Sequence, residues 1–116
     1  MRFGELLQEI RVSKRISLRE LSQKVKLSAA YLSDIERGLR KPPSIQLILK
    51  IAQALETDPE PLLRAALQER DVLELPLNQN FVRTEAALAL ARRWEHLSEE
   101  TLKTITALLE QQSEED

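Results

Sequence analysis

Residues 16–43 read ISLRELSQKVKLSAAYLSDIERGLRKPP and hold two short helical patterns with almost no chain between them. Ser17 followed by Glu20 forms a capping box, in which the serine oxygen accepts from the backbone N–H three residues on and the glutamate reaches back. Ser28 is a second favourable N-cap, and Gly38 can take the left-handed conformation in which many helices end. The stretch therefore predicts a helix that starts at Ser17 and another that starts at Ser28 and stops at Gly38, which together make a helix-turn-helix.

The apolar residues of both patterns fall on one side of each helix. In the first helix, Leu18, Leu21 and Val25 follow the i, i+3, i+7 spacing of an amphipathic helix. In the second, Leu32 and Ile35 share one side, and the opposite side is small and polar with one cation near its end: Ala29, Ala30, Ser33, Asp34 and Arg37. Such a face can lie against the floor of a DNA groove, but a polar outer face is also the rule for surface helices.

Length and composition favour an all-helical chain with one domain and an appendage, or with two very small domains. The chain has 116 residues, 2 glycines, 3% aromatic residues and no cysteine. Without cysteine no disulfide can form, and without a long apolar run nothing points to secretion or a membrane. We therefore expect a cytoplasmic protein. No nucleophile with a matching base and no metal-ligand cluster is visible, so we expect no catalytic residue, no metal and no cofactor, and an enzyme is a remote alternative.

The charge is distributed unevenly along the chain. Residues 1–45 hold 10 Lys and Arg against 5 Asp and Glu, whereas residues 46–116 hold 7 against 14. An excess of cations favours phosphate binding, and an acidic remainder keeps its own surface away from DNA. The net charge of -2 therefore does not argue against a nucleic-acid partner for the first half.

Three further helices are predicted around the helix pair. One spans residues 2–14, another follows the cap at Ser44, and a third follows Asp58 and Pro59. Each carries apolar residues at helical spacing, namely Phe3, Leu6, Leu7 and Ile10, then Ile48, Ile51, Ala52 and Leu55, then Leu62, Leu63, Ala66 and Leu67. Five short helices thus make up a predicted domain over residues 1–70.

Residues 71–80, DVLELPLNQN, interrupt the helical pattern. Pro76 forbids a continuous helix, and the leucines on either side of it alternate as in an extended segment. We therefore predict a linker that lies on apolar surface.

Helical spacing returns beyond the linker and predicts a helical hairpin over residues 81–116, with its second helix starting at Ser98. A hairpin of this size is too small to bury its own apolar side, so it needs either the first domain or the same hairpin of a second chain. For a dimer, the predicted contacts come from its large apolar side chains: Leu90, Trp94, Leu97, Leu102, Ile105 and Leu109.

The sequence of residues 17–44 resembles the lambda-repressor-like helix-turn-helix of the Cro-type (XRE) family of bacterial and phage regulators. The family pattern is matched at Leu18 or Leu21, Ser22, Val25, Leu32, Ile35, Glu36, Gly38 and Pro42. The resemblance covers residues 3–67 and implies an all-α fold, with a five-helix lambda-repressor-like DNA-binding domain followed by the C-terminal helical hairpin. One departure is Lys26, where the family commonly has glycine, and a side chain there costs about 1 kcal/mol of backbone strain.

The resemblance also implies roles for particular residues. The second helix of the motif would enter the major groove, and Arg11 would pair with Glu36 to tie the first helix to the end of this recognition helix. Base contacts are expected from Ala29, Ala30, Ser33 and Asp34. Phosphate contacts are expected from Ser17, Arg19, Lys26, Ser28, Tyr31, Arg37, Arg40 and Lys41.

These expectations add up to a sequence-specific transcriptional regulator that binds a palindromic operator in double-stranded DNA as a homodimer. A repressor is favoured over an activator, because occlusion of a promoter requires only tight binding. The protein would work in the bacterial cytoplasm, at the nucleoid when bound to DNA. The alternative is an antitoxin-like protein, whose acidic hairpin binds a partner protein while the DNA-binding domain autoregulates.

Overall fold

All regular structure is helical in residues 1–115, the part of the backbone that the computed structural model of the chain describes. Side chains are described for residues 1–112, and Asp116, the last residue of the predicted hairpin, lies outside the described residues. The chain divides into a first unit, Met1–Leu75, and a second unit, Pro76–Asp116. The predicted all-helical fold is confirmed.

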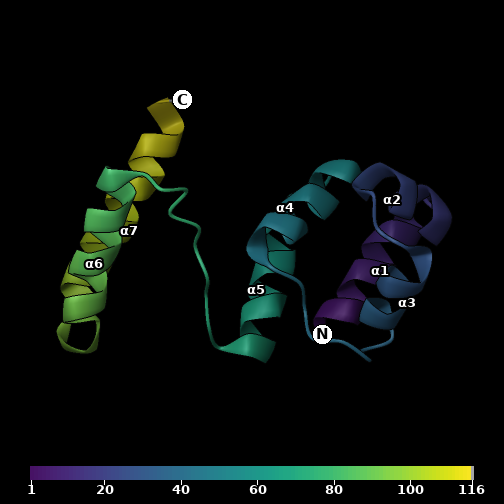
Figure 1. Ribbon diagram of the computed structural model, residues 1–116, viewed down its shortest axis with the longest axis horizontal. Helices are drawn as coiled ribbons and strands as arrows, with labels where there is room; N and C mark the ends of the chain where they lie inside the picture. Colours follow the sequence, from purple (N-terminus) through teal and green to yellow (C-terminus); the bar gives the residue numbers. More distant parts are fainter. Residues whose placement is uncertain (116) are drawn as a thin grey trace. The chain divides into compact units, whose positions relative to one another are not determined.

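Five helices make up the first unit (Figure 1). They are α1 (Phe3–Ser13), α2 (Leu18–Val25), α3 (Ala29–Glu36), α4 (Ile45–Ala54) and α5 (Glu60–Arg70). Helix α1 packs on α3 and α5, α2 packs on α3 and α4, and α4 packs on α5. The short helix α3 is therefore held by two neighbours, which leaves one side of it free to face outward.

The apolar faces of the five helices close into one core. Its largest members, each no more than 1% exposed, are Phe3, Leu7, Leu21, Val25, Leu32, Ile35, Ile48, Ile51, Leu55 and Leu62. Burial of each such side chain contributes about 1.5–3 kcal/mol, so this core is the main source of stability. The predicted stripe is wrong at one position of α5, because Leu67 is 37% exposed while the small side chain of Ala65 is buried.

Side-chain caps begin both helices of the helix-turn-helix, α2 and α3, as the sequence predicts. The Ser17 side chain accepts from the Glu20 N–H and the Glu20 side chain reaches back, so the capping box is confirmed. At the other end of α2, Lys26 adopts the left-handed conformation, with φ 58° and ψ 44°. Gly38 takes a φ of 76° after α3, where glycine has no Cβ to clash.

The segment of residues 71–80 forms neither helix nor strand. Its leucines are not covered, since Leu73 is 48% exposed and Leu75 is 63% exposed. The expectation that the linker lies on apolar surface is therefore wrong. The physical reason is that the helices of the first unit already bury one another's apolar faces.

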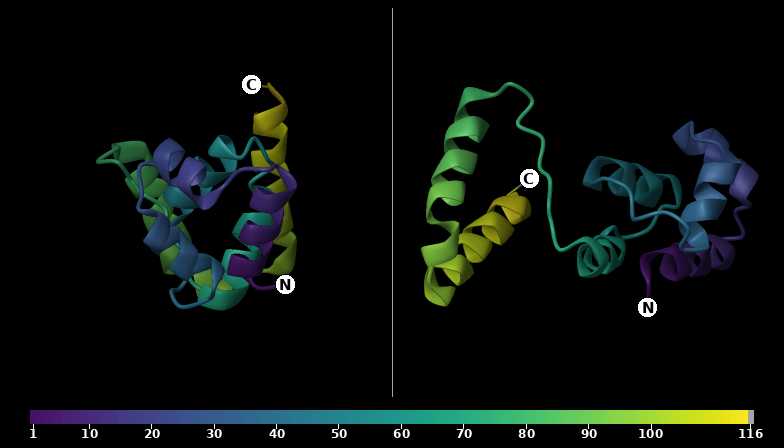
Figure 2. Two further views of the ribbon diagram at one scale, coloured as in Figure 1. Left: turned by 90° about the vertical axis from the view of Figure 1, so that its right-hand side faces the viewer. Right: turned by 60° about the horizontal axis from the view of Figure 1, so that its bottom comes forward.

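The second unit holds α6 (Phe81–Arg93), a single 3₁₀ turn (Trp94–His96) and α7 (Glu99–Glu115). Figure 2 shows the two helices leaving this turn and diverging from it. No residue of α6 is buried, and Trp94 is 58% exposed. Among the predicted dimer contacts, Leu90 and Leu109 are also exposed, and the other three are half-buried: Leu97, Leu102 and Ile105. The hairpin thus does not bury its own apolar side.

No helix in the described part of the chain is both long and apolar enough to cross a bilayer.

Candidate nucleic-acid interface

The outward side of α3 gathers the residues that were expected to contact bases. Leu32, Ile35 and Glu36 face the interior and are buried. On the opposite side Ala30 is exposed, and three neighbours are half-buried: Ala29, Ser33 and Asp34. With side chains this short, a groove floor can approach the α3 backbone closely.

A network of charges covers the C-terminal half of this face. The Asp34 carboxylate accepts a hydrogen bond from Arg37 Nη2 at 2.8 Å, and its other oxygen lies 3.5 Å from Arg40 Nε. The Arg40 guanidinium stacks over the Tyr31 ring, 5.1 Å from its centroid. Asp34 therefore holds two cations beside the outward face of α3.

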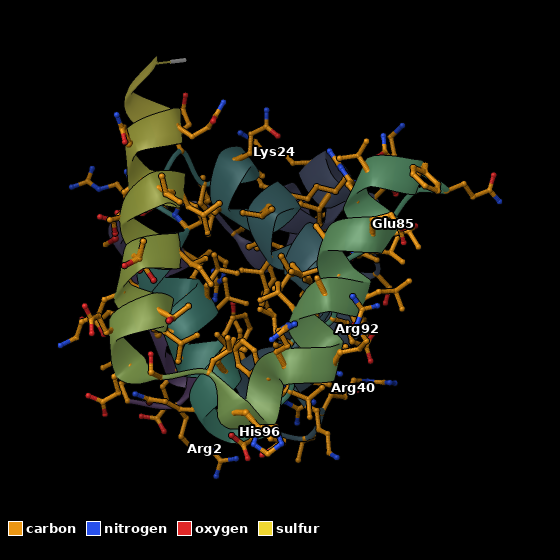
Figure 3. The ribbon with its side chains drawn as sticks, turned by 90° about the vertical axis from the view of Figure 1, so that its left-hand side faces the viewer. Arg2, Lys24, Arg40, Glu85, Arg92 and His96 are labelled. Carbon is orange, nitrogen blue, oxygen red and sulfur yellow. The ribbon has the colours of Figure 1, made fainter. Side chains whose placement is uncertain are left out.

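The remaining candidates for phosphate contact lie around this face. Ser17 and Ser28 each accept a backbone N–H at 3.0 Å at a helix N-terminus, which leaves the serine O–H free to donate to a phosphate. The other cations are exposed: Arg19, Lys26 and Lys41. Arg40 extends away from the ribbon with 56% of its side chain exposed (Figure 3). The cations thus lie at both ends of the outward side of α3.

A buried ion pair fixes α3 to α1. Arg11 Nε and Nη2 donate to the two Glu36 carboxylate oxygens at 2.7 and 3.0 Å, and Arg11 Nη1 donates to the Ile16 carbonyl at 2.9 Å. The hydrogen bond to Glu36 raises the pKa of Arg11, against the opposing effect of burial. One guanidinium therefore joins α1, the turn before α2 and the end of α3, which is a structural role.

The structure also adds contacts that the sequence analysis missed, at the end of α5. Glu69 Oε2 accepts from the Phe3 N–H at 2.8 Å, and the other Glu69 oxygen lies 3.2 Å from Arg2 Nη2. Arg70 Nη1 donates to the Pro42 carbonyl at 3.1 Å and to the Pro43 carbonyl at 3.3 Å. These contacts join residues far apart in the chain, and most of them use a backbone N–H or carbonyl, so no local pattern in the sequence could have revealed them.

Gly4 is another residue whose structural role the sequence analysis did not predict. A Cβ added at Gly4 would lie 2.6 Å from the Glu36 carbonyl oxygen and against the Ile35 carbonyl. Glycine therefore lets α1 approach the C-terminal end of α3. A glycine inside a predicted helix was the only available signal.

Within the described residues, no group of His, Asp and Glu side chains is arranged to hold a metal ion.

Residues 7–62 match the family described as Helix-turn-helix. The transcriptional regulator SinR of Bacillus licheniformis is 35% identical over 71 residues, which are 61% of this chain and 60% of SinR. Control protein C.BamHI of Bacillus amyloliquefaciens is 42% identical over 62 residues, which are 53% of this chain and 75% of that protein. The matched segments span 54 to 63% of the SinR and ClgR regulators of Bacillus and Mycobacterium tuberculosis.

Two solved structures are similar to this one. A crystal structure of SinR in complex with DNA shares 38% identity and covers 53% of this chain and 97% of that chain, with a TM-score of 0.50. A SinR protein/SinI protein complex covers 97% of this chain and 98% of that chain, with a TM-score of 0.50. At 23% identity the second likeness shows the fold alone.

The fold and the outward face of α3 define a helix-turn-helix protein. Given the matches above, the chain belongs to the XRE-type helix-turn-helix family, so the resemblance seen in the sequence is confirmed. This family comprises DNA-binding transcriptional regulators, which are not enzymes.

Proposed function

We propose that this chain is a sequence-specific transcriptional regulator that places α3 in the major groove of double-stranded DNA. The observation that carries the proposal is the outward side of α3, where small side chains lie between cations. A similar protein, SinR, occurs in a crystal structure in complex with DNA. The proposed assignment gives residues 1–70 the DNA-binding role, with residues 71–80 as linker.

Base readout in this proposal is short-ranged. The methyl groups of Ala29 and Ala30 contact thymine methyls, and Ser33 donates to or accepts from a base edge. Asp34 accepts from a cytosine amino group once Arg37 or Arg40 turns to a phosphate. Affinity then rests mainly on phosphate contacts, from Ser17, Arg19, Lys26, Ser28, Tyr31, Arg37, Arg40 and Lys41, and it falls steeply with salt.

The proposed mode of regulation is repression by a homodimer on a palindromic operator. Two recognition helices then lie one DNA turn apart, about 34 Å, and the protein occludes the promoter it covers. The hairpin of residues 81–116 supplies the dimer contact, because the exposed side of α6 and α7 is apolar and too small to be stable alone. In this role the protein acts in the bacterial cytoplasm, at the nucleoid when bound.

A second candidate function uses the same hairpin to bind a different protein, as in an antitoxin-like regulator. It is supported by the exposed Trp94 and by the acidic charge of residues 46–116. The two candidates differ in what the hairpin touches. Self-association of the purified chain at low concentration favours the dimer, whereas a monomer that requires a neighbouring protein favours the second candidate.

Selection of bound duplexes from a random DNA pool tests the proposed function directly. The full chain is expected to enrich a two-fold symmetric motif with half-sites one DNA turn apart. Ala30→Glu is the control, because Ala30 is exposed and a carboxylate there repels the groove without disturbing the core. The proposal fails if the full chain enriches no motif, or if Ala30→Glu enriches the same motif equally well.

A further inference from the structure

Few backbone hydrogen bonds hold the loop that follows α3, although Pro42 and Pro43 are buried and Arg40 contacts Asp34 and Tyr31. The Leu39 N–H donates to the Asp34 carbonyl at 2.8 Å, but among the described residues no backbone N–H of residues 40–43 donates to another backbone carbonyl. Pro42 and Pro43 have no N–H to donate. The loop nevertheless carries Arg40 and Lys41, two of the proposed phosphate contacts.

Arg70 supplies side-chain hydrogen bonds to the backbone of this loop. Its Nη1 bridges the Pro42 and Pro43 carbonyls at 3.1 and 3.3 Å, and hydrogen bonds from a charged donor are stronger than those between neutral groups. The side chain is half-buried, so water competes less for these carbonyls than on an open surface. Both acceptors directly follow Arg40 and Lys41, and their position therefore sets where the loop backbone lies.

The end of α5 is itself well anchored. Leu62 and Ala66 of the same helix belong to the core. The residue before Arg70 is Glu69, whose carboxylate accepts from the Phe3 N–H at the start of α1 at 2.8 Å. Arg70 therefore extends from a fixed helix end, and it can hold the loop in place.

We propose that Arg70 is a positioning residue for DNA binding, which fixes the loop of residues 39–43 so that Arg40 and Lys41 meet the phosphates beside α3. This inference rests on the proposed function, since it specifies how part of the phosphate contact is made. Arg70 acts through the two proline carbonyls rather than by a contact of its own with the DNA.

The test compares Arg70→Gln with Arg64→Gln in the full chain. Arg64 is a matched control, because it lies on the same helix, is exposed, and pairs with Glu60 of α5 at 2.9 Å. Affinity for the selected operator duplex is measured over a series of salt concentrations. Arg70→Gln is expected to weaken binding by about tenfold and to lower the salt slope by up to about 2, the value for two phosphate contacts, with the preferred sequence unchanged.

A coupled set of variants separates positioning from general stability. With Arg40 and Lys41 both replaced by Gln, the further change Arg70→Gln is expected to leave affinity and salt slope unchanged. Arg70→Lys keeps a charged donor and is expected to restore most of the affinity. A loss that persists without Arg40 and Lys41, or a lysine variant no better than glutamine, overturns the inference.

Amide hydrogen exchange in the free protein gives a readout that needs no DNA. Arg70→Gln is expected to speed exchange at Leu39, the loop residue whose N–H donates to the Asp34 carbonyl, while α2 and α3 keep their protection. Faster exchange throughout α3 would indicate loss of the fold and would overturn the positioning role. If the wild-type chain binds DNA and Arg70→Gln matches Arg64→Gln, the inference alone fails, whereas absence of DNA binding by the wild type defeats the proposed function.

Discussion

At the scale of single residues, the turn between α2 and α3 places a lysine where the backbone conformation favours glycine. Lys26 occupies a left-handed position at φ 58°, where side chains are disfavoured and glycine is not. The same lysine is exposed in the turn just before α3 and is a proposed phosphate contact. Stability and DNA binding therefore make opposite demands on this residue.

Lys26→Gly is expected to raise the free energy of unfolding by up to about 1 kcal/mol, because the strain disappears. Affinity for all DNA sequences should fall together, since one phosphate contact is lost. Urea unfolding and duplex titration measure the two effects. Lys26→Asn, which removes the charge and tolerates the left-handed conformation, should lose the same affinity; unchanged DNA binding in both variants would contradict the phosphate role.

Asp34 is the second residue where two roles meet, because its carboxylate holds Arg37 and Arg40 in the free protein. Asp34→Asn is expected to alter base preference at one position of each half-site, and to raise affinity for random DNA because both cations are released. Selection from random DNA and titration of a scrambled duplex measure these effects. Glu9→Gln removes an equal charge from the exposed surface of α1 and should change neither quantity.

At the scale of elements, the position of α3 depends on its contact with α1. The Arg11–Glu36 pair is almost inaccessible, with side chains 11% and 4% exposed. Removal of one partner leaves the other charge buried, so Arg11→Met is expected to cost about 3–5 kcal/mol in urea unfolding. Combining it with Glu36→Leu should cost less than the two single changes added together. Glu60→Gln breaks an exposed pair and serves as the control, with a loss of about 0.5 kcal/mol or less.

Gly4 makes the same contact between helices possible through the backbone. Gly4→Ala is expected to destabilise the protein by about 1–3 kcal/mol, because the added methyl group forces α1 away from the carbonyls of Ile35 and Glu36. DNA affinity should fall as well, since α3 moves with this contact. Gln8→Ala, at an exposed position of α1, is the control and should not reduce stability. A Gly4→Ala protein as stable as the wild type would mean that the two helices adjust without cost.

The elements also show which parts of the structure can be predicted from the sequence. The Ser17–Glu20 capping box and the Leu32 and Ile35 anchors depend on residues within one or two helical turns, so a local pattern contains them. The contacts of Glu69 with the Phe3 N–H and of Arg70 with two proline carbonyls join residues 27 to 66 positions apart and use backbone groups, which carry no sequence pattern. The exposed leucines of the linker were missed for a related reason, because whether an apolar surface is already covered depends on the whole fold.

At the scale of the whole molecule, two units with different surfaces share one chain. The first has a closed core and a face suited to DNA, and the second exposes apolar side chains that one hairpin does not cover. A single α3 with short side chains makes few base contacts, so specific binding in this proposal requires two copies held together. Joining two such domains raises the effective concentration of the second once the first is bound, and the hairpin then contributes to affinity without contacting DNA.

Deletion of residues 81–116 is therefore expected to convert the dimer to a monomer and to weaken operator binding by more than tenfold, while the first unit stays folded. Trp94→Glu tests the same contact by one change, because the side chain of Trp94 is 58% exposed. Val82→Glu is the matched control on α6, exposed and outside the proposed dimer contacts. Analytical ultracentrifugation measures dimerisation, and operator titration measures DNA affinity. A truncated chain that still sediments as a dimer would remove the hairpin from the mechanism, whereas a monomeric wild type whose hairpin captures a partner protein would support the antitoxin-like alternative.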